Sequence, residues 1–216
     1  MFLTNRSVAF LLAAAFFIGV TSCDDTTDDA GYDIPDTYTF ENVSYDGQLQ
    51  RLSQLQEMKS YLVTAENDGA TLDANRLKAM FANDAANANW DRTYDASKQL
   101  KNKTFENEQA WYESLFEKVA LASQAATQTA AEGQAGTAVS SDGAKRYLLD
   151  ANGVEITQLI EKGLMGACFY YQATAVYFGD GKMDVDNETV EPGEGTAMEH
   201  HWDEAFGYFG VPTDFP

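Results

Sequence analysis

The segment that most constrains the fold runs from Val154 to Phe178 and reads VEITQLIEKGLMGACFYYQATAVYF. Its charged residues are confined to the first turns, and aromatic or aliphatic residues then follow on every side. A helix that is apolar all round is normally buried by other helices, so this segment predicts a helix at the centre of a bundle. Gly163 and Gly166 each disfavour a helix by about 1 kcal/mol relative to alanine, which indicates close approach of a neighbouring helix.

Three other segments have the spacing of amphipathic helices. Apolar residues recur at intervals of three and four from about Gly47 to Ala65, and Asp68-Gly69 ends the pattern. A second helix is predicted from about Asp73 to Asn83. A third, longer helix is predicted from Asn107 to about Ala131, and its apolar side carries Trp111, Leu115, Phe116, Val119 and Ala122.

Two stretches between these helices contain turn-forming residues. Residues 132–144, EGQAGTAVSSDGA, are rich in glycine, serine and alanine and predict a flexible connection. Residues 146–156, RYLLDANGVEI, hold an Asn-Gly pair between apolar residues, which fits either a tight β-hairpin or the approach to a helix. Together the segments predict an all-α fold, a helical bundle of about five helices over residues 38–216.

The last predicted helix holds the only two histidines of the chain, within GTAMEHHWDEAFGYFG at 195–210. Thr196 followed by Glu199 fits a capping box, so a helix is predicted to begin at about residue 196. Helical spacing gives an apolar side, which we expect to face the core, made of Met198, Trp202, Ala205, Phe206 and Phe209. The opposite side carries His200 and Glu204, with His201 beside Glu204.

These polar residues form a candidate metal site. Neutral imidazole and carboxylate groups are ligands for cations such as iron and zinc, so we expect His201, Glu204 and His200 to bind iron or another divalent metal. The remaining ligands would come from another helix, the preceding loop or solvent. The alternative is an amphipathic helix with a hydrated polar face. The order HHWDE lacks the HExxH arrangement of common zinc peptidases, which argues against proteolysis.

An acidic loop, GDGKMDVDNETVEPGEG, precedes this helix. Acidic side chains alternate in it, and oxygen ligands of this kind can surround calcium; the candidates are Asp180, Asp184, Asp186 and Glu188. The loop lacks the glycine that an EF-hand carries at its sixth position. The calcium interpretation therefore stands beside that of a hydrated acidic loop.

The N-terminus has a bacterial export pattern. Residues 1–22 contain one charge, Arg6, and an apolar run that is too short for a permanent transmembrane helix, so they predict a cleaved signal peptide. Cys23 directly follows small residues, as in a lipoprotein signal, which predicts acylation of Cys23 and anchoring to a membrane. The alternative is an ordinary signal peptide cut nearby, with Cys23 a free thiol. Residues 23–37 are acidic and predict a flexible tether.

Charge and cysteine content narrow the classes of partner. The chain has 14 basic and 34 acidic residues, a formal net charge of −20, which repels phosphate backbones and argues against nucleic acid as a partner. If Cys23 is acylated, Cys168 has no partner for a disulfide and is expected to be a small core residue.

Parts of the sequence resemble two known families. His201-Trp-Asp-Glu204 resembles the GxHxxE stretch of imelysin-like proteins, which are helical bundle proteins of bacterial envelopes linked to iron uptake. More closely, the segments YTFENVSYDGQLQRL, NGVEITQLIEKG, LIEKGLMGACFYYQ and TAMEHHWDEAFGYFGVPTDFP resemble a Bacteroidetes lipoprotein family, domain of unknown function 4856. His201 and Glu204 match the histidine and glutamate of the imelysin motif, whereas Glu199 stands in place of its glycine.

The resemblance implies a location and a role. We expect a lipid-anchored protein of the outer membrane, on its periplasmic or its outward face, that assists iron or haem acquisition by binding a cation. Members of the family continue beyond a Val-Pro-x-Asp-Phe-Pro segment, which implies a bundle that is incomplete at the C-terminus. The alternative is a surface module that docks a TonB-type receptor or an adhesin without metal, and a third hypothesis is an envelope metallopeptidase.

Overall fold

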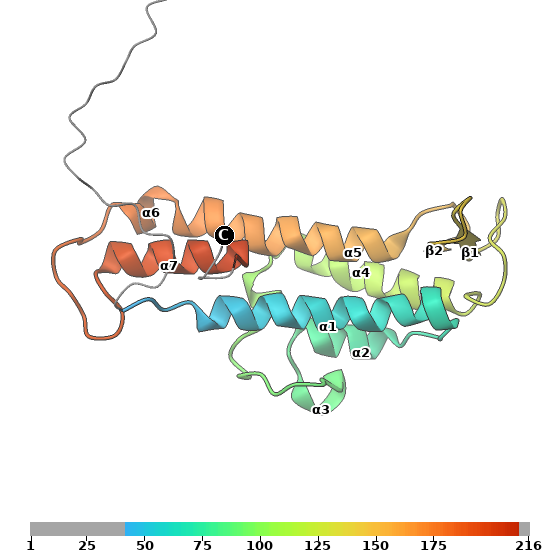
Figure 1. The fold of residues 1–216 in the computed structure, drawn as a ribbon, viewed down its shortest axis with the longest axis horizontal. Coiled ribbons are helices and arrows are strands. Elements are labelled where there is room, and N and C mark those ends of the chain that lie inside the picture. Colours follow the sequence, from blue (N-terminus) through green and yellow to red (C-terminus); the bar gives the residue numbers. More distant parts are fainter. Residues whose placement is uncertain (1–41, 212–216) are drawn as a thin grey trace, which may run out of the picture. The chain divides into compact units, whose positions relative to one another are not determined.

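The computed structural model describes residues 42–211. The predictions for the signal peptide at 1–22, for Cys23 and for the tether at 23–37 concern residues outside this range. Between residues 42 and 211 the chain forms seven α-helices, a 3₁₀-helix (η1), a π-helix (η2) and two short strands, so the mostly helical fold is confirmed (Figure 1). Within this range no helix combines the length and the apolar character needed to cross a bilayer.

The first helices begin and end where the local sequence predicts. Helix α1 spans Asp46–Asp68 and ends at Gly69, whose positive φ of 69° suits a glycine and whose N–H donates to the Thr64 carbonyl. Helix α2 spans Ala74–Phe81, and the Asp73 side chain caps it by accepting from the Asn75 N–H. A short α3, Ala85–Ala88, and η1, Lys101–Lys103, follow in the polar stretch before α4.

Helix α4 spans Glu106–Ser123 and is shorter than predicted. The residues after it are held by strand β1, Gly136–Val139, which pairs antiparallel with β2, Arg146–Leu149. The prediction of a flexible connection at 132–144 is therefore wrong for β1. Thr137 fixes the position of β1, because its side chain is buried. Its hydroxyl donates to the Ala126 carbonyl at 2.6 Å, and its N–H donates to the Gln128 carbonyl at 2.8 Å.

The apolar segment forms one continuous helical rod. Helix α5, Ile156–Leu164, leads directly into η2, Met165–Tyr177. The Asn152-Gly153 turn precedes α5, so this pair leads into a helix and does not form the hairpin. The prediction of burial on every side is wrong, because Met165 and Tyr170 are exposed.

The two glycines of this rod differ. A Cβ on Gly163 would lie 2.6 Å from the Tyr112 hydroxyl oxygen, so the expected close approach exists there. A Cβ on Gly166 would meet no atom of residues 42–211 within 4 Å, so close approach of a neighbouring helix does not explain a glycine at this position. Helices α6, Asp180–Met183, and α7, Ala197–Phe209, complete the described fold.

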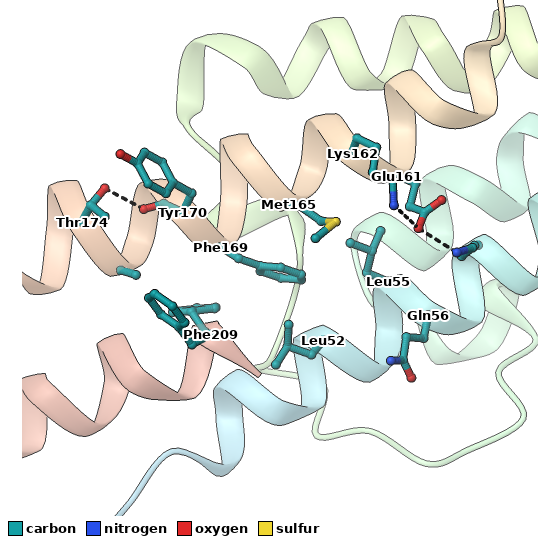
Figure 2. A pocket seen from close by; sticks show the side chains of 13 residues that line it. Leu52, Leu55, Gln56, Glu161, Lys162, Met165, Phe169, Tyr170, Thr174 and Phe209 are labelled. Atoms are coloured by element: carbon teal, nitrogen blue, oxygen red, sulfur yellow. Dashed lines mark hydrogen bonds and ion pairs between the residues drawn. The ribbon is translucent and has the colours of Figure 1, made fainter. Parts of the chain in front are cut away.

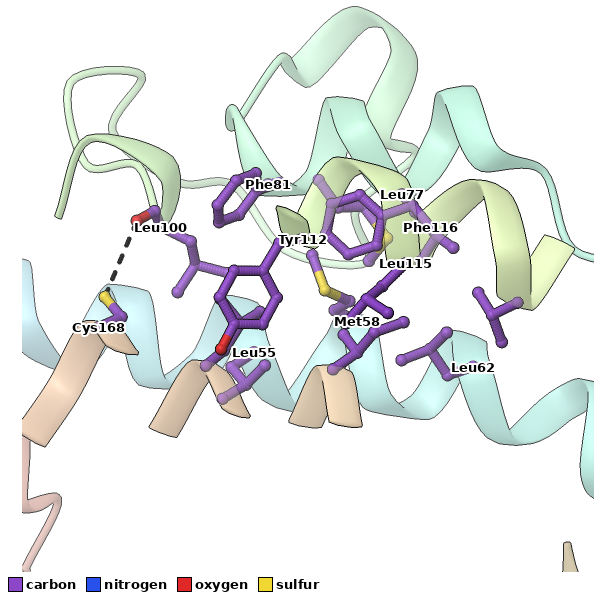
Figure 3. Close-up of a cluster of buried hydrophobic side chains, with 14 of the residues drawn as sticks. Leu55, Met58, Leu62, Leu77, Phe81, Leu100, Tyr112, Leu115, Phe116 and Cys168 are labelled. Atoms are coloured by element: carbon purple, nitrogen blue, oxygen red, sulfur yellow. Dashed lines mark hydrogen bonds between the residues drawn. The ribbon is translucent and has the colours of Figure 1, made fainter. Parts of the chain in front are cut away.

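The main core lies where α1, α2, α4 and α5 pack together (Figure 3). Met58, Phe81 and Phe116 are almost wholly excluded from solvent, and each such side chain contributes roughly 1.5–3 kcal/mol through burial. Cys168 lies in the same core, with its Sγ 3.8 Å from the Leu100 carbonyl oxygen. Tyr112 occupies the inward position that the sequence assigns to Trp111, which is exposed.

Candidate functional site

Helix α7 begins with the predicted capping box. The Thr196 hydroxyl accepts from the Glu199 N–H at 3.1 Å, and the Glu199 carboxylate accepts from the Thr196 N–H at 2.8 Å. Thr196 is buried, so this cap fixes the position at which the helix starts. The residue at which α7 begins determines on which side of the helix each later side chain lies.

The side of α7 that faces the core is only in part the one predicted, since Ala205 is buried as expected. Trp202 and Phe209 are 52% and 71% exposed, whereas Asp203 and Gly207 are buried. Gly207 packs directly on α1, and the Asp203 carboxylate accepts from the Ser44 N–H at 3.0 Å. Inward-facing polar residues of α7 therefore find their partners at the start of α1.

This orientation turns His201 and Glu204 inward, with side chains only 14% and 19% exposed. Glu204 Oε1 accepts from Gln48 Nε2 at 3.0 Å. Glu204 Oε2 lies 3.5 Å from His201 Nδ1 and 3.6 Å from His200 Nε2, while His200 Nδ1 lies 2.8 Å from Glu194 Oε2. We refer to these five residues as the α7 cluster.

The surroundings of the α7 cluster affect its titration. Burial raises the pKa of Tyr177, and the charge of Glu204 and a hydrogen bond with it raise it further. Lys103 donates to the Tyr177 hydroxyl at 2.9 Å, and burial lowers the pKa of this lysine. Burial also lowers the pKa of His201, and the charge of Lys182 acts in the same direction against the charge of Glu204. Glu204 is thus surrounded by groups that can donate hydrogen bonds.

The fold brings all three predicted metal ligands together. His200 Nε2 and His201 Nδ1 both lie near Glu204 Oε2. Within residues 42–211, however, no group of three or more His, Cys, Asp or Glu side chains is arranged to hold a metal ion. A cation at the α7 cluster would therefore need donors from solvent or from another molecule, and metal binding stays a prediction.

The predicted calcium residues are not brought together in a comparable way. Asp180 begins the short helix α6, and the Asp184 N–H at its end donates to the Asp180 carbonyl at 3.0 Å. Within residues 42–211 no three such acids are arranged to hold a metal ion. Asp186 accepts from the backbone N–H groups of Glu188 and Thr189, and its hydrogen bonds to Thr189 lower its pKa. The loop geometry thus employs Asp186 in a turn, and calcium binding also stays a prediction.

A second feature, not anticipated from the sequence, is an apolar groove of about 460 Å³ between α1, the α5–η2 rod and α7. Figure 2 shows its walls: Leu52 and Leu55 come from α1, Met165 and Phe169 from η2, and Phe209 from the end of α7. Helix α7 has 13 residues and α1 has 23, so α1 and the rod continue past Phe209 without α7 between them.

One end of the groove is charged. Lys59 on α1 and Lys162 on α5 both contact Glu161 Oε1, at 2.8 and 3.0 Å. Burial favours a higher pKa for Glu161, but the hydrogen bonds from Lys59 and then Lys162 outweigh it and lower the pKa. Glu161 therefore stays ionised at neutral pH and neutralises one of the two lysines.

Helical spacing in the sequence could not predict this groove. A π-helix closes its turns with i→i+5 hydrogen bonds, so the side on which a residue lies drifts away from that in an α-helix. Tyr170, within η2 and expected at the bundle centre, lies exposed beside the groove, as does Met165 at the start of η2. π-helical turns often occur at functional sites, which directs attention to η2.

The fold and these two features define a mostly helical domain with a ligand-sized groove. The chain belongs to the family described as domain of unknown function DUF4856, whose sequence pattern matches residues 35–215. No curated protein and no solved structure matches the chain. The predicted resemblance to this family is confirmed, while the Bacteroidetes origin and the relation to imelysins stay predictions.

Proposed function

We propose that the protein is an envelope-anchored binding protein that takes an apolar small molecule into the groove between α1, η2 and α7. The observation that supports this best is the groove itself, whose volume of about 460 Å³ lies within the roughly 300–1,000 Å³ of small-molecule sites. Met165, Tyr170 and Phe209 are exposed along it. Covering their apolar surface would contribute about 25 cal/mol per Å² to binding.

Part of the groove wall is packed into the core, which favours binding. Leu55, Phe169 and Tyr208 line it and are at the same time buried in the core. The rings of Phe169 and Tyr208 stack with centroids 5.8 Å apart, which joins η2 to α7. A preformed site loses little conformational entropy when a ligand enters.

The location proposed for this activity comes from the sequence. Acylation of Cys23 would anchor the domain to the outer membrane through the acidic tether at 23–37. The groove would then take up its ligand close to a membrane surface, on either the periplasmic or the outward face.

The proposal is tested with the purified protein and a neutral apolar fluorophore, N-phenylnaphthylamine. We expect saturable binding that Thr174→Trp abolishes, because Thr174 lines the groove and an indole there would fill it. Ala175→Trp is the matched control, since Ala175 is the next residue of η2, is exposed and lies outside the lining. Equal binding by both variants would refute the groove as the site.

A second candidate function is cation binding at the α7 cluster, in support of iron or haem acquisition. The observation that favours it is the inward direction of His201 and Glu204, with His200 beside them. Titration with iron, zinc and haem should show binding that His201→Ala and Glu204→Ala weaken together. Glu132→Ala, a change of an exposed acid outside both the cluster and the acidic loop, is the control.

Two outcomes would redirect this second candidate. Co-purification with a TonB-type receptor in the absence of metal would support the docking alternative, in which the α7 cluster is structural. Peptidase activity that a chelator abolishes would support the third hypothesis, a metallopeptidase.

A further inference from the structure

We propose that the ligand of the groove is an amphiphile with a single anionic head, which lies at Lys59 and Lys162 while its hydrocarbon chain extends along the apolar walls toward Phe209. This inference rests on the proposed function and specifies its ligand class. It follows from the charge, the direction and the composition of the groove.

The local charge of the groove is opposite to that of the protein. The whole chain carries a formal charge of −20. Among the described residues that line the groove, the charged ones are Lys59, Lys162 and Glu161, which sum to +1. A local charge of +1 can attract one anionic group, whereas the negative charge of the rest of the protein disfavours a second one.

Both ammonium groups are available to a ligand. Their side chains are 48% and 59% exposed, although each contacts Glu161. An ammonium has three N–H donors, and the contact with Glu161 Oε1 employs one of them. The remaining donors can therefore bind a carboxylate while the ion pairs with Glu161 persist.

The arrangement of polar and apolar residues sets the direction of the ligand. Figure 2 shows Glu161 and Lys162 toward one end of the groove and Phe209 toward the other, with Met165 and Phe169 between them. Lys59 and Lys162 come from two facing helices, so they flank the charged end. A linear molecule with a head and an apolar tail matches this order.

The test compares dodecanoate with dodecanol, which share a hydrocarbon chain and differ in the charge of the head. Binding is measured on the purified protein by displacement of N-phenylnaphthylamine, below the concentration at which either compound forms micelles. We expect dodecanoate to bind about fivefold more tightly than dodecanol, since exposed ion pairs contribute modestly. Added salt should reduce this preference.

Three variants separate the contributions. Lys59→Gln with Lys162→Gln should remove the preference for dodecanoate, and Glu161→Gln should increase it because both lysines are then free of their partner. Lys78→Gln is the matched control, since Lys78 is a half-exposed lysine paired with Glu117 on α4, away from the groove. Dodecanol should bind the wild type and all three variants alike if they fold alike, which circular dichroism checks.

The outcomes distinguish this inference from the proposed function. If N-phenylnaphthylamine itself does not bind, the proposed function fails. If it binds and neither compound displaces it, the inference of an anionic amphiphile is overturned. If both bind equally and the lysine variants change nothing, the groove binds apolar molecules but the inference of an anionic head is overturned. If a chain that ends at Val211 binds both compounds more tightly, the residues after Val211 are the occupant of the groove. If the affinity for both compounds depends on protein concentration, a second copy of the chain is the occupant. Either result overturns the inference.

Discussion

The packing of α7 on α1 can be tested at Gly207. A Cβ on this residue would lie 2.6 Å from the Tyr45 Cβ and 2.9 Å from the Gln48 Cβ. Both atoms are attached directly to the backbone, so no side-chain rotation removes the clash and the two helices must separate. Overpacking of this kind costs roughly 3 kcal/mol at the upper end of its range, and the better helix propensity of alanine offsets about 1 kcal/mol. Gly207→Ala should therefore lower the free energy of unfolding by about 2 kcal/mol.

The matched control for Gly207→Ala is Gly166→Ala. A Cβ on Gly166 meets no atom of residues 42–211 within 4 Å, so alanine there should be neutral or stabilise by up to about 1 kcal/mol. Thermal unfolding followed by circular dichroism should show Gly207→Ala melting roughly 4–8 °C below the wild type. If Gly207→Ala is as stable as the wild type while Gly166→Ala behaves as expected, α7 does not pack on α1 as closely as the structure shows.

Three further predictions concern single residues. Thr196→Ala should cost about 1 kcal/mol in chemical denaturation through loss of the capping box, and Thr196→Ser should retain most of it; equal stability of all three proteins would contradict this role. Burial raises the pKa of Cys168 to about 12, so a thiol reagent should not react with Cys168 until the protein unfolds. One reactive thiol in the folded protein would then be that of Cys23 and would indicate that Cys23 is not acylated. Burial holds the pKa of His201 below its ordinary 6.5, so as the pH decreases the imidazole is protonated in the unfolded chain before it is protonated in the folded protein. The free energy of unfolding should therefore fall as the pH decreases from 6.5 to the pKa of the folded state. His201→Gln should reduce this dependence of stability on pH, and an unchanged dependence would contradict the lowered pKa of His201.

Helix ends were predictable because their signals are local. Gly69 ends α1 in the left-handed conformation, Asp73 caps α2 and the Thr196–Glu199 pair caps α7, each through contacts within a few residues. The antiparallel β1–β2 pair was missed because Thr137 is held by carbonyls of the segment after α4, contacts that glycine and serine content does not reveal.

The inward side of α7 could be predicted only in part from its own residues. Asp203 and Gly207 are residue types suited to the surface, but Asp203 bonds to Ser44, 159 residues earlier, and Gly207 permits contact with α1. Those partners bury the polar side and leave Trp202 exposed. The three candidate ligands were identified correctly as neighbours, whereas their direction depended on these distant partners. The groove was missed because it arises from the unequal lengths of α7 and α1 and from π-helical geometry in η2.

Photochemical labelling can show directly whether the groove beside η2 binds an apolar molecule. A neutral alkyl probe with a photoreactive group on its chain is irradiated with the protein, and the modified residues are mapped by mass spectrometry. We expect labels on Met165, Tyr170 and Phe209 that N-phenylnaphthylamine suppresses. Labels spread equally over Leu121 and Val190, which are exposed apolar residues outside the groove, would contradict binding in the groove.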